Sequence, residues 1–270
     1  MIVKDLKITN FRNIKNLNLS FSPKINLIYG ENAQGKTNIV EALGFLSMLK
    51  SFRNDENHTL IKDDEDFAIV ESIIEKENSK QTLKSIITKT SYKNFINKSE
   101  IKKVGDFIGT LNIVTFDPTD VNLFKSNPRT RRTLLNDELS KISPSYYMAL
   151  VQFNKILKER NEILKSQNIN KTLVEVLTSQ YSKVNYELFI KRKKFIEDLT
   201  LLINDKYQKI SGDKNEITIE YINQFSEIST ANDIYEKVME SYKEDCLKLA
   251  TQIGIHRDDF IVKINGKSTT

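Results

Sequence analysis

The sequence GENAQGKT at residues 30–37 combines two glycines, a lysine and a threonine at a spacing that suits phosphate binding. Gly30 and Gly35 permit backbone conformations that a Cβ forbids, and successive N–H groups between them can point at one anion. Lys36 can reach β- and γ-phosphates, and the Thr37 hydroxyl can bind Mg²⁺. We therefore expect a nucleoside triphosphate and Mg²⁺ here, with Lys36 as the catalytic residue and contacts from Gly30, Glu31, Asn32, Ala33, Gln34, Gly35, Lys36 and Thr37.

The identity of the base and the presence of a hydrolytic centre depend on other motifs. The sequence has no Asn-Lys-x-Asp motif of the kind that reads guanine, which favours ATP over GTP. A P-loop hydrolase also needs an acidic residue at the end of a buried strand. The one stretch of that shape is NIVTFD, ending at Asp117, but Thr115 interrupts it and Pro118 follows. Residues 117–120 are better interpreted as a turn and helix N-cap.

Three other charged groups are candidate sites. Arg129, Arg131 and Arg132 lie at the start of an expected helix, where guanidiniums oppose the helix dipole, so a binding role is suggested. The basic run at 191–194 is interpreted as a solvated helix face. The sequence HRDD at 256–259 could form a metal or acid–base site, although a capped turn with local ion pairs is the commoner arrangement.

Hydrophobic periodicity predicts the elements that hold these residues. Alternation at 17–21 indicates a half-buried strand, and INLIY at 25–29 is the continuous apolar run of a strand buried on both faces. Residues 36–50 fit a helix that is buried around much of its circumference. Residues 67–117 are expected to form an antiparallel meander from the segments FAIVESII, LKSIIT, NFINKSEI and LNIVTF.

The second half of the chain has a helical period. The segments YYMALVQFNKILKERNEILK and LVEVLTSQYSKVNYELFIKRKKFIEDLTLLI are expected to form an antiparallel helical hairpin with SQNINK as its turn. A strand, EITIEYI, and a helix at about 231–251 follow. Within the second hairpin helix, the apolar positions close to a heptad seam are 173, 176, 177, 184, 188, 195, 199 and 202.

The last residues predict a hairpin. DFIVKI alternates like a strand, and NGK at 265–267 is a strong turn signal. Because little sequence follows the turn, we expect a chain interrupted within a domain; a frayed tail after an edge strand is the alternative. The expected organisation is a nucleotide-binding lobe at 1–117, a mainly helical second lobe at 118–250, and a segment at 251–270 that returns to the sheet and stops within a hairpin.

Composition places limits on the class of protein. The 270 residues include 41 Lys and Arg against 36 Asp and Glu, a net charge of +5 that permits nucleic-acid binding without requiring it. A single cysteine, Cys246, excludes an internal disulfide framework and a Cys-rich metal site. The N-terminus lacks the apolar segment of a signal peptide, and no apolar run reaches 18 residues. We expect a cytoplasmic protein with no membrane association.

Several blocks of sequence occur in an order that resembles the RecF recombination-mediator family. The resemblance covers nearly the whole chain and is weakest in 66–110 and 166–245. Its blocks are ITNFRNI (8–14), GENAQGKTNIVEAL (30–43), SFR (51–53), FDPTDVNLFKSNPRTRRTLL (116–135), LKERNEILK (157–165) and GIHRDDF (254–260).

The resemblance implies a mixed α/β fold with two lobes. The first is an ABC-type ATP-binding lobe that resembles an SMC head and contains the antiparallel meander. The second lobe is mainly helical and contains the helical hairpin. It implies binding of ATP and Mg²⁺, an ATP-dependent homodimer, and binding to duplex DNA or single-strand/double-strand junctions. Family members act with RecO and RecR to load RecA onto gapped DNA in repair, replication and the SOS response. Lys36 and Thr37 are expected to contact phosphate and Mg²⁺, and Arg12 and Asn13 to help hold the nucleotide.

The chain departs from the family pattern in a few places. Asn136 stands where the family usually has Asp, and Ile255 where Pro usually precedes HRDD. Family members, which are slow DNA-dependent ATPases, continue into a signature motif and a Walker B strand that do not occur in these residues. We therefore expect residual or no hydrolysis by this chain. A P-loop small-molecule kinase and a purely structural SMC-like head are the alternatives.

Overall fold

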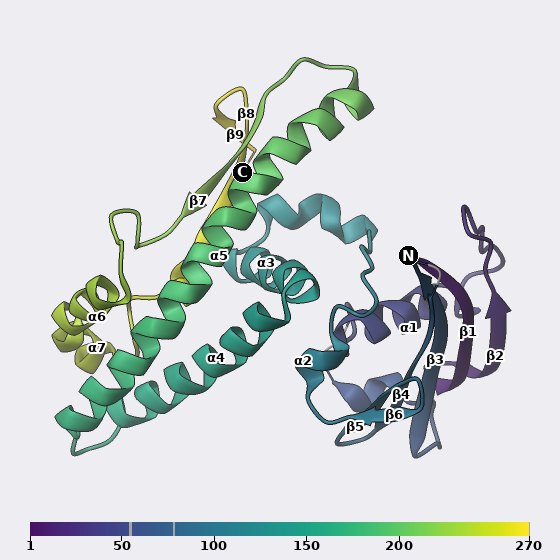
Figure 1. Ribbon diagram of the computed structural model, residues 1–270, viewed down its shortest axis with the longest axis horizontal. Helices are drawn as coiled ribbons and strands as arrows, with labels where there is room; N and C mark the ends of the chain where they lie inside the picture. The colour runs from purple at the N-terminus through teal and green to yellow at the C-terminus, as the bar shows by residue number, and fades with distance from the viewer. Residues whose placement is uncertain (54–55, 78, 270) are drawn as a thin grey trace. The chain divides into compact units, whose positions relative to one another are not determined.

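The computed structural model describes residues 1–53, 56–77 and 79–269. These residues form two compact units (Figure 1). The first consists of Met1–Phe116 with Ser140–Pro144, and the second of Asp117–Leu139 with Ser145–Thr270. Each unit has its own hydrophobic core, so each is described separately.

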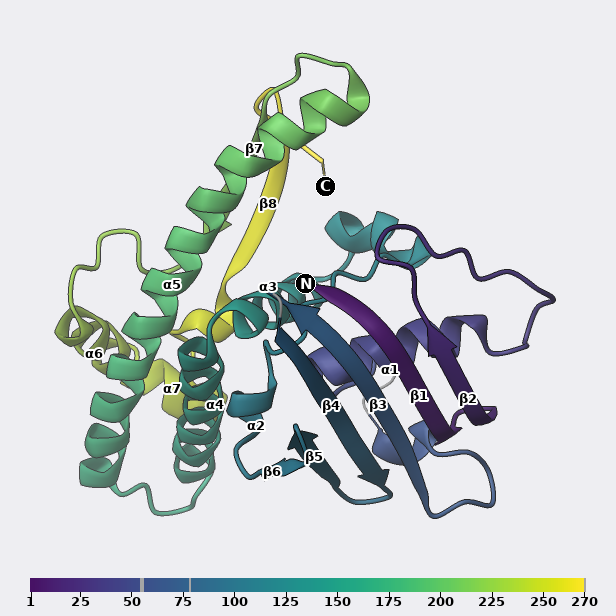
Figure 2. The same cartoon turned by 45° about the vertical axis from the view of Figure 1, so that its right-hand side comes forward.

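The first unit is built on a six-stranded antiparallel sheet with the order β2-β1-β3-β4-β5-β6 (Figure 2). Each neighbouring pair is antiparallel, as the predicted meander requires. The strands are β1 (Ile2–Phe11), β2 (Ile14–Ser20), β3 (Phe67–Lys76), β4 (Ser79–Thr88), β5 (Tyr92–Ile96) and β6 (Ser99–Ile101).

One face of this sheet is buried beneath helix α1 (Lys36–Met48). Alternate residues of β3 and β4 are buried, which is the period-2 pattern of a sheet with one covered face. Phe45 and Leu46 of α1 are fully buried in the same cluster as Leu6 and Val70. The short helices of this unit are the 3₁₀ helix η1 (Asn57–Leu60) and α2 (Val104–Phe107).

Two segments predicted as strands are not strands. Residues 25–29 and 112–116 form no strand, and Ile25, Leu27 and Val114 are each more than 80% exposed. The predictions were wrong because an apolar run becomes a strand only when another strand supplies hydrogen-bond partners on its edge. The described residues provide no strand that pairs with either segment.

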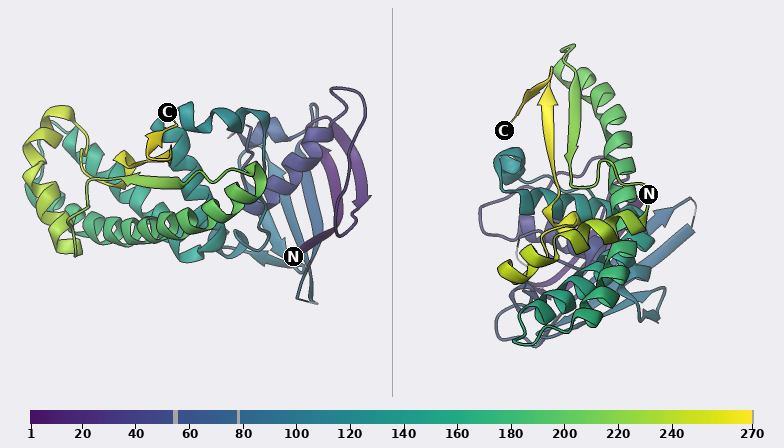
Figure 3. Two further views of the ribbon diagram at one scale, coloured as in Figure 1. Left: turned by 90° about the horizontal axis from the view of Figure 1, so that it is seen from above. Right: turned by 90° about the vertical axis from the view of Figure 1, so that its left-hand side faces the viewer.

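The second unit contains the predicted helical hairpin, formed by α4 (Pro144–Leu164) and α5 (Lys171–Ser211), which run antiparallel side by side (Figures 1 and 3). Asn170 caps α5 by accepting the Leu173 N–H at 3.1 Å, and Gly212 ends it at φ 72°. The predicted helix at 231–251 is divided at Ser241. The other helices are η2 (Pro118–Lys125), α3 (Pro128–Ile142), α6 (Ala231–Glu240), α7 (Tyr242–Lys248) and η3 (Ile255–Arg257). Among the described helices, none has the length and apolar character needed to cross a membrane.

A three-stranded sheet completes the second unit, in the order β7 (Ile217–Ile222), β8 (Asp259–Ile264) and β9 (Lys267–Ser268). The predicted hairpin joins β8 to β9, and Asn265 (φ 49°) and Gly266 (φ 76°) form its turn, with both residues in the left-handed region. Within the segment 251–270, β8 pairs with β7, which offers an edge within the second unit.

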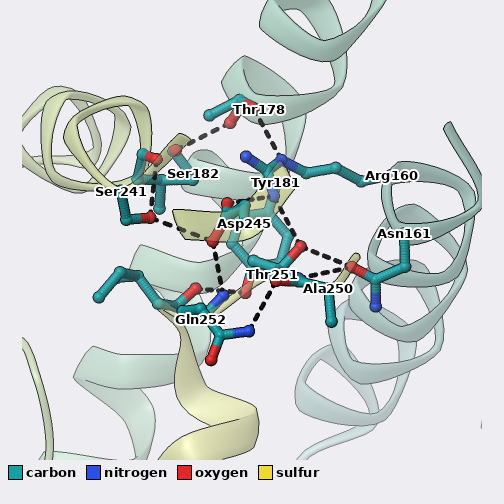
Figure 4. Close-up of polar contacts among 12 residues, drawn as sticks. Arg160, Asn161, Thr178, Tyr181, Ser182, Ser241, Asp245, Ala250, Thr251 and Gln252 are labelled. Atoms are coloured by element: carbon teal, nitrogen blue, oxygen red, sulfur yellow. Dashed lines mark hydrogen bonds and ion pairs between the residues drawn. The ribbon is translucent and has the colours of Figure 1, made fainter. Parts of the chain in front are cut away.

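The buried face of α5 differs from the predicted apolar seam. Leu173, Val176 and Leu202 are exposed, whereas Tyr181 and Asn185 are fully buried. The difference arises because polar groups occupy the interior of this unit. One buried polar cluster joins α4, α5 and α7 around Arg160 and Asp245, as Figure 4 shows.

Candidate functional site

The loop at residues 30–35 leads directly into the N-terminus of α1. Gly35 precedes the helix at φ 92°, a conformation that L side chains rarely adopt. A Cβ at this position would lie 2.7 Å from Oδ1 of Asn13, so the close approach of the β1–β2 turn also requires glycine. Gly30 has φ 150°, with nothing within 4 Å of an added Cβ, so its requirement is conformational only.

The N-terminus of α1 is arranged to receive an anion. No side chain in the described residues caps it, and its first turn contains no acidic residue. The first N–H groups of a helix lack partners within the helix and carry the positive end of its dipole. They border a pocket of about 340 Å³ that is lined by Asn32, Ala33, Gly35, Lys36, Thr37, Asn38 and Arg53.

Lys36 lies within the loop that it is predicted to serve. Its Nζ donates to the Gly30 carbonyl at 2.7 Å and to the Glu31 carbonyl. These bonds hold the ammonium against the loop beside the uncapped helix end. A phosphate in the pocket would provide stronger, charge-assisted acceptors for the same group. Thr37 lines the pocket from the first turn of α1 with its side chain exposed.

Of the predicted contacts, Asn32, Ala33, Gly35, Lys36 and Thr37 line the pocket. Gly30 and Glu31 lie outside its lining and serve as acceptors for Lys36. Gln34 is exposed and also lies outside the lining. The contribution of each residue to ligand binding stays a prediction.

Arg12 and Asn13 support the pocket from the tight β1–β2 turn and do not line it. Asn13 Nδ2 donates to the Ala33 carbonyl at 2.9 Å, and its Oδ1 accepts from Asn38 Nδ2 at 2.8 Å. Arg12 has φ 54°, which is uncommon for a residue with a Cβ. Its side chain is directed to Glu41 and to the Thr59 carbonyl, the latter at 2.6 Å.

Sequence reasoning missed Arg53 as a pocket residue. Its NH1 donates to Asn38 Oδ1 at 3.0 Å, and the residue lies in the pocket lining. The block SFR at 51–53 was the available signal, since it was among the motifs that resemble the family. No spacing rule identifies a basic residue 17 positions beyond the loop lysine as a ligand contact.

The HRDD sequence is a structural turn. Asp259 forms an ion pair with Arg131 at 2.6 Å, and Asp258 forms one with Arg192 at 2.8 Å. Burial raises the pKa of Asp258 to about 6 and lowers the pKa of His256 to about 4. The interpretation as a turn is confirmed, but the expectation of local ion pairs was wrong, because the partners Arg131 and Arg192 are distant in the sequence.

The basic clusters are divided between surface and interior. Arg192 is 1% exposed and donates to Tyr146, Asn136 and Ile255 as well as to Asp258, so the prediction of a solvated face was wrong at this residue. Hydrophobic patterning misassigned it because a guanidinium can be buried when several acceptors surround it. Arg132 donates to the Asp258 carbonyl at 2.7 Å, so it too supports the turn.

The weak Walker B candidate has the geometry of a turn. The Asp117 N–H donates to Asp120 Oδ2 at 2.8 Å. The segment before it is extended without strand pairing. The interpretation of residues 117–120 as a turn ahead of a helix is confirmed by η2, which begins at Pro118.

Comparisons with known proteins agree with the fold and show the family. Residues 2–128 match the family described as "RecF/RecN/SMC N terminal domain". Over 267 residues the chain is 36% identical to the DNA replication and repair protein RecF of Clostridium perfringens, covering 98% of this chain and 74% of that protein. The chain belongs to the RecF family. It is also 38% identical over 271 residues to RecF of Clostridium novyi, covering all of this chain and 75% of the relative.

Solved RecF structures share the fold. The structure described as the recombination mediator protein RecF-ATP in the RecFOR pathway superposes with a TM-score of 0.92 at 29% identity, over 99% of this chain and 74% of that one. A RecF-ATPrS structure gives a TM-score of 0.91 at 30% identity with the same coverage. The expected mixed α/β fold is therefore confirmed. The small-molecule kinase alternative is not supported, because these relatives are RecF proteins.

Proposed function

We propose that this chain binds ATP at the loop 30–37, and that the complete protein is a RecF-type recombination mediator. The observation that carries the proposal is one pocket bordered by the uncapped N-terminus of α1, by Lys36 and by Arg53. Backbone N–H groups and two cations suit a polyphosphate better than an uncharged ligand. The solved relative described as RecF-ATP supports ATP as the nucleotide.

Mg²⁺ would be held at the hydroxyl of Thr37. A threonine in the first turn of the helix, beside the lysine, fits the donor set that P-loop proteins use for this ion. The bound ion would neutralise phosphate charge. The described residues that line the pocket include no carboxylate, so they offer neither an acidic second ligand nor a general base. This composition supports binding with residual or no hydrolysis.

The wider role is proposed from the family. The relatives carry the name DNA replication and repair protein, and the solved neighbours are placed in the RecFOR pathway. We infer that the complete protein binds DNA, forms an ATP-dependent homodimer, and acts with RecO and RecR to load RecA. The net charge of +5 is compatible with contacts to the phosphate backbone. Such binding should weaken steeply with salt, and salt-insensitive or absent DNA binding by the complete protein would favour the purely structural head.

Calorimetric titration with ATP and Mg²⁺ tests the proposed function. Lys36→Ala should weaken binding by about tenfold or more, because a hydrogen bond to a charged group contributes roughly 1.5–3 kcal/mol. Lys102→Ala is the matched control, since Lys102 is an exposed lysine of the same unit outside the pocket lining. Equal affinity for the wild type and Lys36→Ala would refute the assignment of the loop.

A further inference from the structure

Glu41 is a buried carboxylate in contact with Arg53, which lines the proposed phosphate-binding pocket. It lies in α1, one turn beyond Thr37, and its side chain has no exposed surface. A buried carboxylate is strongly unfavourable unless charged and hydrogen-bonding partners surround it. The partners of Glu41 therefore identify which groups it holds in place.

Those partners come from two segments far apart in the sequence. Arg12 donates two hydrogen bonds to the carboxylate, from Nε to Oε2 at 3.1 Å and from NH2 to Oε1 at 2.5 Å. Ser51 Oγ donates to Oε1 at 2.5 Å, and Arg53 NH1 approaches Oε2 at 3.5 Å. One carboxylate thus joins the β1–β2 turn to the segment that follows α1.

The side chains of Arg12 and Arg53 differ in the fraction of their surface that is exposed to solvent. The Arg12 side chain is 18% exposed, and it uses its remaining NH1 on the Thr59 carbonyl. The Arg53 side chain is 49% exposed and lines the pocket. In the described part of the chain, the side-chain bonds of Arg53 all involve NH1, so Nε and NH2 remain available to a ligand. The carboxylate neutralises only one of the two guanidiniums, which leaves positive charge beside Lys36.

We propose that Glu41 is a positioning residue for nucleotide binding, which holds Arg53 at the pocket and, through Arg12, fixes the turn that supports the loop. The inference rests on the proposed function and extends it, because Glu41 acts on the triphosphate only through these two arginines. Because Glu41 and Asn38 already hold NH1 of Arg53, its guanidinium loses less conformational entropy when phosphate binds.

The test compares ATP affinities of the wild type, Glu41→Gln, Arg12→Ala/Arg53→Ala and the triple variant. Glu41→Gln keeps the side-chain volume and should weaken ATP binding by about fivefold or more, and Glu41→Asp should recover part of the loss. In the Arg12→Ala/Arg53→Ala background, adding Glu41→Gln should change the affinity by less than twofold. An equal loss in both backgrounds would overturn the proposal, since it would show that Glu41 acts independently of the arginines.

A second measurement does not require nucleotide. The Arg12 Nε–H signal in ¹H–¹⁵N spectra should move in Glu41→Gln and stay in place in Ser72→Ala, a control that removes a buried hydroxyl elsewhere in the same unit. An unmoved signal in Glu41→Gln would overturn the proposal that Glu41 holds Arg12. A wild-type chain that binds no ATP contradicts the proposed function, and the Arg12 signal then still decides whether Glu41 orients this side chain.

Discussion

Gly35 and Asn13 are in such close approach that a Cβ on the glycine would lie 2.7 Å from the asparagine Oδ1. This approach brings the β1–β2 turn against the residue that directly precedes α1. Asn13 also donates to the Ala33 carbonyl at 2.9 Å. The shape of the loop therefore depends on the turn as well as on its own sequence.

Gly35→Ala should disrupt the close approach of Gly35 and Asn13. The substitution combines a left-handed backbone, which costs about 1–2 kcal/mol for an L residue, with a collision against Asn13. We expect a lower unfolding free energy and loss of ATP binding. Gly30→Ala is a control in the same loop, because it has the strained φ without a collision. Thermal melts that show equal losses for the two variants would contradict the role of Asn13.

Arg160 and Asp245 form the central ion pair of the second unit (Figure 4). They are 2.7 Å apart, and neither side chain has exposed surface. Removal of one partner leaves a buried charge, so Arg160→Ala should lower the unfolding free energy by about 3–5 kcal/mol. Urea denaturation measures this loss.

The surface pair between Lys158 and Glu162 on the same helix is the control for that measurement. Its closest atoms are 3.9 Å apart and both side chains are mostly exposed, so Lys158→Ala should cost less than about 1 kcal/mol. Similar losses for the two variants would show that the buried pair contributes no more than a solvated one.

His256 should make stability depend on pH. Burial lowers its pKa to about 4 from an ordinary value near 6.5, so the folded state binds fewer protons than the unfolded state between those values. Stability from this group is complete above about pH 6.5 and is lost as the pH falls toward 4. The difference amounts to at most about 3 kcal/mol, and less because the ring is only partly buried.

The measurement for His256 is the unfolding free energy at pH 7 and pH 4.5. His256→Gln should lose less stability over this interval than the wild type does. His58→Gln should behave as the wild type, because the His58 side chain is 62% exposed. If His256→Gln loses as much unfolding free energy between pH 7 and pH 4.5 as the wild type, His256 is not the source of the pH dependence.

The glycine-rich loop at residues 30–35 and the helix after it were predictable because their sequence pattern lies within one short segment. The meander and the helical hairpin were predictable from period-2 and helical patterns. The segment 25–29 was mispredicted because an apolar run does not contain its own pairing partner. A strand forms only when a second segment pairs with it, and the hydrophobic pattern of residues 25–29 says nothing about whether such a segment is present.

The polar interiors could not be predicted from single residues. Arg192 occurs in a run of four basic residues, yet its side chain is buried against Asp258. In the sequence, Glu41 looks like an ordinary polar residue of a helix. Its hydrogen bonds with Arg12 and Arg53 form only in the folded structure. In each case the charge is stabilised by partners that are distant in sequence, which hydrophobic periodicity does not detect.

Hydrogen exchange of the backbone amides at residues 33–38, measured with and without ATP and Mg²⁺, tests the central claim most directly. The uncapped N–H groups of α1 are the ones that the phosphates should bind. Slower exchange at these amides in the wild type, and no slowing in Lys36→Ala, is the predicted result. Exchange that ATP leaves unchanged at residues 33–38 would contradict nucleotide binding at this loop.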